Sequence, residues 1–147
     1  MTDPRIHLTL DNCFAVKRWT RPADWSDVIA SLGDIACIEA STDNELDPLF
    51  TTPEYLDDWA DAAGAETKKR GQRIASLYSG HATYRSIGLT HDDERVREAV
   101  YRNWVLPVIG QASRVGAGLG FYLHAFTEPM LQDPDHYANA TDRLMGY

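Results

Sequence analysis

Apolar and polar positions alternate along four short segments of the chain, at residues 6–11, 35–39, 73–78 and 118–124. In the first segment Ile6, Leu8 and Leu10 share one parity, and His7, Thr9 and Asp11 share the other. Because strand side chains point alternately to the two sides of a sheet, this pattern predicts four strands. One face of the sheet should pack against helices, and the other should carry polar side chains.

Apolar residues at helical spacing follow each predicted strand. They predict helices over about residues 20–33, 53–71, 92–115 and 135–147. Pro107 lies inside the third helix and is expected to kink it. Strands that alternate with helices indicate an α/β fold with a parallel sheet and right-handed crossovers.

The spacing of the strands favours one architecture. They begin about every 37 residues, so eight such units need about 300 residues, which is the usual size of a (β/α)8 barrel. The 147 residues supply four units, so residues 1–147 are expected to be the amino-terminal half of a truncated TIM barrel, with strands in the order 1-2-3-4. The alternative is a complete small doubly wound α/β binding module, in which the strand order reverses about a switch point.

Reactive side chains end the polar face of each predicted strand: Asp11, Glu39, Tyr78 and His124. Open α/β sheets and β/α barrels place their active sites at the carboxyl ends of their strands. The pattern therefore indicates an enzyme. Glu39 ends an otherwise apolar strand and is the candidate for proton transfer, although a carboxylate that binds a substrate hydroxyl gives the same pattern.

Charge and cysteine content narrow the possible partners and location. The net charge is −8 and the isoelectric point is about 4.9, which argues against a nucleic-acid or anionic-membrane surface. Cys13 and Cys37 form neither a metal motif nor a disulfide framework. No apolar run resembles a signal sequence or a bilayer span, so a cytoplasmic protein is expected.

Five segments together resemble the amino-terminal half of the sugar phosphate isomerase/epimerase family, the xylose-isomerase-like TIM barrels. They are residues 8–15 (LTLDNCFA), 18–22 (RWTRP), 38–41 (IEAS), 77–81 (LYSGH) and 116–126 (GAGLGFYLHAF). The resemblance implies a metal-dependent enzyme that acts on a small sugar or sugar phosphate. Such an enzyme transfers a proton next to a carbonyl while a divalent metal stabilises the enediolate.

The resemblance also implies roles for individual residues. The residues expected to line the sugar pocket are Asp11, Asn12, Phe14, Trp19, Glu39, Tyr78, His81, Tyr122 and His124. The metal, Mn, Mg, Co or Zn, should be held by Glu, Asp, His and Glu residues beyond residue 147, so residues 1–147 alone are expected to be inactive. Unpaired strand edges also predict a homo-oligomer.

A second metal hypothesis concerns the two histidines. DNA-repair endonucleases of the same barrel type hold extra zinc ions on histidines at early strand ends, and His81 and His124 are the candidates here. Neither histidine belongs to an HxH or HExxH motif, and the acidic balance opposes a DNA groove. This zinc-dependent endonuclease remains the alternative enzyme class.

Overall fold

The computed structural model describes residues 7–80, 86–121 and 125–147. Four parallel strands form its sheet in the order β1-β2-β3-β4: β1 (Thr9–Asp11), β2 (Cys37–Ser41), β3 (Arg73–Ser79) and β4 (Gly118–Phe121). The sequential order confirms the half-barrel prediction. It also shows that the doubly wound alternative is wrong, because that fold needs a reversed order.

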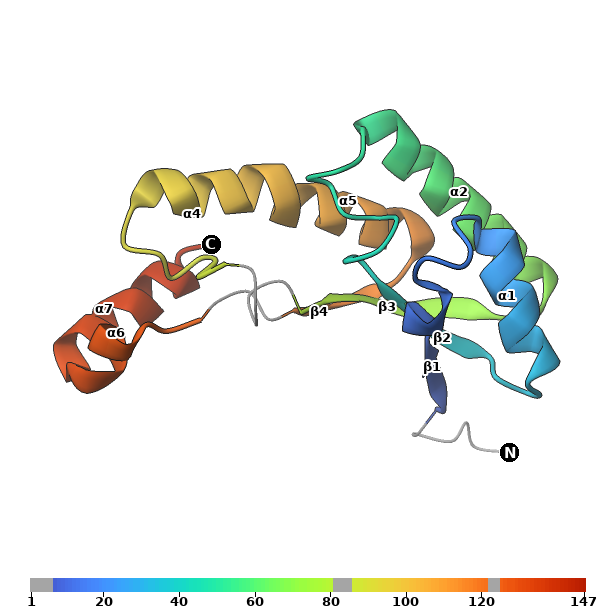
Figure 1. Cartoon of the computed structure of the whole chain (residues 1–147), viewed down its shortest axis with the longest axis horizontal. Coiled ribbons are helices and arrows are strands. Elements are labelled where there is room, and N and C mark those ends of the chain that lie inside the picture. Colours follow the sequence, from blue (N-terminus) through green and yellow to red (C-terminus); the bar gives the residue numbers. More distant parts are fainter. Residues whose placement is uncertain (1–6, 81–85, 122–124) are drawn as a thin grey trace.

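The helices lie mainly on one side of the sheet (Figure 1). Their bounds are α1 (Pro22–Ser31), α2 (Pro53–Lys69), α4 (Glu94–Val100), α5 (Leu106–Val115), α6 (Glu128–Gln132) and α7 (Pro134–Met145), with a 3-10 turn η1 (Asn12–Ala15) and a π turn η2 (Tyr101–Val105). The expected strands and helices are present with shifted ends. The short helix α6 was not predicted, because five residues are too few to show a helical period.

Local sequence explains where the helices start and stop. Thr52 caps α2 by accepting a hydrogen bond from the Tyr55 N–H at 3.3 Å. Gly116 ends α5 in the left-handed conformation with φ of 69°, which a glycine adopts without steric cost. The Ala117 N–H then bonds the Ala112 carbonyl at 2.9 Å and satisfies the end of the helix.

The predicted kink at Pro107 takes the form of a π turn. Proline lacks an N–H, and its ring clashes with the carbonyl four residues earlier, which belongs to Asn103. The chain widens just before the proline, where the Leu106 N–H bonds the Tyr101 carbonyl five residues back. The single helix expected over residues 92–115 is therefore three segments, α4, η2 and α5.

The core lies between the sheet and the helices that cover it. Ile38, Ala40 and Leu77 are fully buried on the sheet side. Trp25 of α1 and Trp59 of α2 stack with ring centroids 6.4 Å apart. Large aromatic side chains bury much apolar area, so this pair helps to fix both helices on the sheet.

Strand β3 contains an irregularity that strict alternation does not predict. Ile38 pairs with Ile74, but Glu39 pairs with Ser76, so Ala75 is an extra residue. A bulge of this kind changes which face the following residues occupy. Ile74 and Leu77, which have opposite parity, are consequently both buried in the core.

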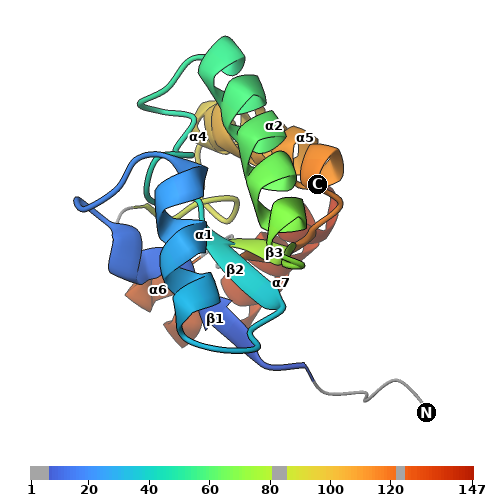
Figure 2. The ribbon, with the colours of Figure 1, turned by 90° about the vertical axis from the view of Figure 1, so that its right-hand side faces the viewer.

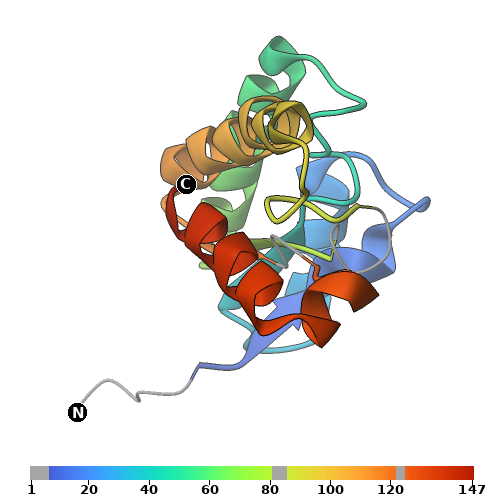
Figure 3. The ribbon, with the colours of Figure 1, turned by 90° about the vertical axis from the view of Figure 1, so that its left-hand side faces the viewer.

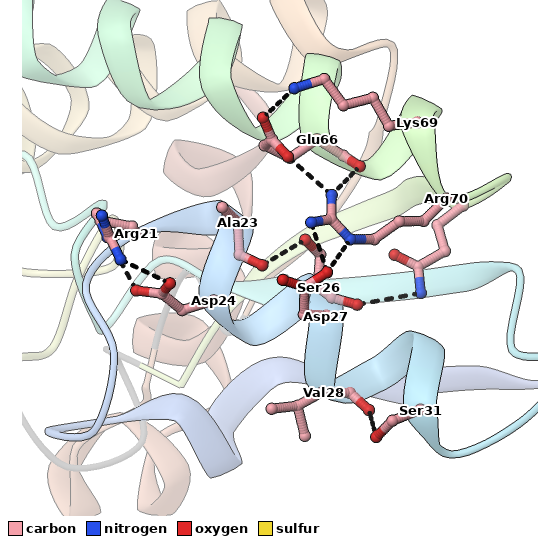
Figure 4. A network of polar contacts seen from close by, with 11 residues as sticks. Arg21, Ala23, Asp24, Ser26, Asp27, Val28, Ser31, Glu66, Lys69 and Arg70 are labelled. Atoms are coloured by element: carbon pink, nitrogen blue, oxygen red, sulfur yellow. Dashed lines mark hydrogen bonds and ion pairs between the residues drawn. The ribbon is translucent and has the colours of Figure 1, made fainter.

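Polar contacts join the middle of α1 to the carboxyl end of α2 (Figure 4). The Arg70 guanidinium donates from Nε to Asp27 at 2.6 Å and from Nη1 to Glu66 at 2.8 Å. Since Asp27 is exposed, these contacts add little stability but fix the relative position of the two helices.

The carboxyl-terminal helices lie at the opposite end of the molecule from α1 (Figures 2 and 3). Asp92 accepts hydrogen bonds from Arg143 and contacts His136, both at 3.1 Å, which ties α7 to the segment before α4. The rings of Tyr101 and Tyr147 lie 5.1 Å apart and add an apolar contact. Among the described residues, no helix is both long and apolar enough to cross a bilayer.

Candidate functional site

The polar face of the sheet collects reactive side chains from three neighbouring strands. Asp11 pairs with Glu39, and Glu39 pairs with Ser76. Ile38, next to Glu39, is buried under the helices, so Glu39 faces the other way. Asp11, Glu39 and Ser76 therefore form a row across the side of the sheet opposite the core helices.

A hydrogen-bonded cluster lies at the carboxyl end of this face. The Tyr78 hydroxyl donates to Asp11 Oδ2 at 2.6 Å, and the Cys13 N–H donates to Asp11 Oδ1 at 2.6 Å. Cys13 Sγ lies 2.8 Å from the Tyr78 oxygen. Because the Tyr78 hydroxyl already donates its proton to Asp11, the Cys13 thiol is the donor in the hydrogen bond between Sγ and the Tyr78 oxygen.

Both neutral groups in this cluster hold their protons. Burial, followed by the hydrogen bond to Asp11, raises the pKa of Tyr78 far above its usual value. Burial also raises the pKa of the Cys13 thiol, and the charge of Asp11 acts in the same direction. At neutral pH the cluster thus presents one carboxylate with a protonated phenol and thiol, a set suited to binding hydroxyl groups rather than to nucleophilic attack.

Glu39 has its own partner on the same face. The Ser76 hydroxyl donates to Glu39 Oε1 at 2.7 Å, and the Glu39 side chain is half-buried. This bond uses one carboxylate oxygen and fixes the orientation of the group. The second oxygen can accept a proton or a hydroxyl hydrogen bond from a bound molecule.

Three of the predicted pocket residues, Asn12, Phe14 and Trp19, support the structure around the site. Asn12 is buried, and its amide oxygen accepts the Ser41 N–H at 2.8 Å, which holds the η1 turn against β2. Phe14 and Trp19 pack edge to face, with centroids 6.2 Å apart, and both are half-buried against the core. His81, Tyr122 and His124, the other predicted members, lie outside the described residues.

The loop after β2 is also fastened to the end of β3. Asp43 accepts hydrogen bonds from the Ser79 hydroxyl at 2.6 Å and from the Gly80 N–H at 2.9 Å. The Thr42 N–H bonds the Tyr78 carbonyl at 2.8 Å. These contacts hold the Tyr78 backbone in place beside the site.

Sequence reasoning did not assign Cys13, Ser76 or Asp43 to this region. Cys13 and Asp43 each follow a strand end by two residues, which is a usable signal. Ser76 has the same parity as Tyr78, so period two places it on the polar face, but its position beside Glu39 depends on the register that the extra residue Ala75 sets between β2 and β3.

The described residues do not by themselves make a metal centre, since they include no group of three or more His, Cys, Asp or Glu residues close enough to hold an ion. Residues 7–80, 86–121 and 125–147 therefore offer no complete ligand set for the divalent metal that the family resemblance implies. A groove of about 610 Å³ lies away from the polar face, between α2 and the η2–α5 helix, where its lining includes Leu56, Arg102 and Gln111.

Comparisons with known proteins identify the fold. Neither a family model nor a curated protein matches the chain. A solved structure, the "putative xylose isomerase" of Rhodospirillum rubrum, superposes with a TM-score of 0.76 at 21% sequence identity. The match covers 95% of this chain and 48% of that one, so the chain spans about half the length of the protein it resembles. The chain therefore has the fold of one half of a xylose-isomerase-like β/α barrel.

Proposed function

We propose that residues 1–147 supply the amino-terminal half of the substrate pocket of a sugar or sugar-phosphate isomerase or epimerase. The observation that carries the proposal is the convergence of Asp11, Glu39 and Tyr78 on the face of a half-barrel sheet that lies opposite the core helices. Barrel enzymes bind their substrates at the carboxyl ends of their strands. The likeness in fold to a protein named as a xylose isomerase supports the same substrate class.

The residues of the site have distinct proposed roles. Asp11, held in place by the Tyr78 phenol and the Cys13 N–H, accepts hydrogen bonds from sugar hydroxyls. The free oxygen of Glu39 binds a hydroxyl or accepts the proton removed from carbon. The divalent ion that such enzymes use to stabilise an enediolate oxygen is expected on other strand ends of a complete barrel.

Binding tests the proposal without requiring turnover. Saturation-transfer NMR on residues 1–147 with aldoses, ketoses and their phosphates should detect weak, millimolar binding, because half of a pocket makes half of the contacts. Glu39→Gln and Tyr78→Phe should each weaken it, whereas Ile109→Lys, at an exposed position of α5, should not. The proposal fails if no sugar binds, or if binding is unchanged in both site variants.

A further inference from the structure

The sheet has two open edges. Within the described ranges, β1 is paired only with β2, and β4 is paired only with β3. An open edge presents unpaired N–H and C=O groups and promotes association with another strand. Closing a sheet into a barrel removes both edges at once.

Exposed apolar side chains accompany both edges. At the β1 end, Leu8 is 74% exposed, and Leu32, the C-cap residue of α1, is 61% exposed. At the β4 end, Leu131 of α6 is 64% exposed and Met145 of α7 is 79% exposed. These two groups lie at opposite ends of the molecule, with α1 at one end and α6–α7 at the other (Figure 1).

We infer that residues 1–147 associate as a two-fold dimer in which β1 of each copy pairs in parallel with β4 of the other. A two-fold axis along the strand direction keeps all eight strands parallel and closes both edges through two identical contacts. In a barrel each helix covers the junction of two strands. The α6–α7 pair would then cover the new junction and meet Leu8 and Leu32 of the second copy.

The number of strands identifies a second copy of this chain as the partner at the open edges of the sheet. The sheet has four strands in sequential order, and the chain matches 48% of the solved barrel chain, so two copies supply one complete set. The second copy also completes the polar face, because each copy contributes Asp11, Glu39 and Tyr78 to half of a shared rim. This last consequence rests on the proposed function, whereas the strand pairing does not.

Sedimentation velocity and a charge exchange between the two edges test the dimer. The unmodified chain should sediment as a dimer of two 16.5 kDa copies. L8K/L32K and L131E/M145E should each raise the dimer dissociation constant about tenfold or more, because each places charges at both contacts. An equimolar mixture of the two variants should dimerise again, since one contact then joins Lys to Glu and the other is unmodified.

Ile109→Lys is the matched control, because Ile109 on α5 is 42% exposed and lies on neither edge. Circular dichroism and thermal unfolding should be similar for every variant, as all five positions are exposed. The inference is overturned by a monomer at about 100 µM, by open-ended larger species, by an Ile109→Lys effect as large as that of L8K/L32K, or by a mixture that stays monomeric. Sugar binding without dimerisation would overturn the dimer and leave the proposed function standing.

Discussion

The Tyr78 hydroxyl on β3 bonds the Asp11 carboxylate at the end of β1 at 2.6 Å, across the intervening strand β2. Side chains from two strands that are not neighbours can meet in this way only if they lie on the same face. The contact therefore shows directly that the polar ends of these strands converge. It also fixes Asp11, which accepts the Cys13 N–H on its other oxygen.

Tyr78→Phe should weaken the sheet where β1 and β3 converge. The change removes the donor to Asp11 and leaves the half-buried ring in place. We expect a loss of about 1 kcal/mol in the free energy of unfolding, because a hydrogen bond to a charged group contributes more than a neutral one but this one is partly exposed. Urea unfolding followed by circular dichroism measures it. Tyr55→Phe, at an exposed position of α2, should change the stability much less.

Asp11→Asn should make the Cys13 thiol ionise more readily. Burial is the main cause of the raised thiol pKa, and the Asp11 charge adds to it, so removing that charge lowers the pKa of Cys13. The pH profile of iodoacetamide alkylation at Cys13, followed by peptide mass spectrometry, should move to lower pH. Cys37 is buried and should stay unmodified. An unchanged profile in Asp11→Asn, or an equal shift in Asp58→Asn on α2, would contradict this account.

Most of the fold could be predicted because hydrophobic period and helix ends are local properties. Pro22 and Pro53 begin helices and Gly116 ends one, as their backbone preferences require. The position of Asp11 and Tyr78 on one face follows from the parity of the strand ends. The bulge at Ala75 could not be predicted, because it depends on the register between β2 and β3, which only the folded sheet defines.

Substitutions in β3 test this bulge. Strict alternation would bury only one of Ile74 and Leu77, but both are buried in the structure. Ile74→Ala and Leu77→Ala should therefore each lower the free energy of unfolding by about 2–4 kcal/mol, the cost of a cavity in a packed core. Ser76→Ala, on the polar face, should cost under about 1 kcal/mol. A small effect at either apolar position, measured by urea unfolding, would show that the strand has no bulge there.

The supporting residues of the site show a second limit of sequence reasoning. Asn12 has the polar character of a ligand-binding residue, yet its amide oxygen is used by the Ser41 N–H. A buried polar group has to find a partner, and sequence does not distinguish a partner in the backbone from one in a substrate. The role of Ser76 in orienting Glu39 depends likewise on the pairing of β2 with β3, which only the folded sheet defines.

The contact between Asp92 and α7 should make the docking of this helix sensitive to acid. The hydrogen bond to His136, assisted by Arg143, lowers the pKa of Asp92 below its ordinary value of 3.8. A carboxyl whose pKa is lowered in the folded state contributes stability that is present above the unfolded pKa and is lost as the pH falls through the folded pKa. Hydrogen exchange of the α7 amides, compared with the amides of α2 in the same sample, should therefore show α7 losing protection selectively below about pH 4.

Two variants separate the contribution of Asp92 from other effects. Asp92→Asn should show weaker protection in α7 at neutral pH and little of this pH dependence. Asp142→Asn, an exposed change on α7 itself, should behave as the unmodified chain. If α7 in Asp92→Asn keeps full protection at neutral pH, the polar contacts of Asp92 do not hold this helix, and the apolar contact between Tyr101 and Tyr147 is sufficient.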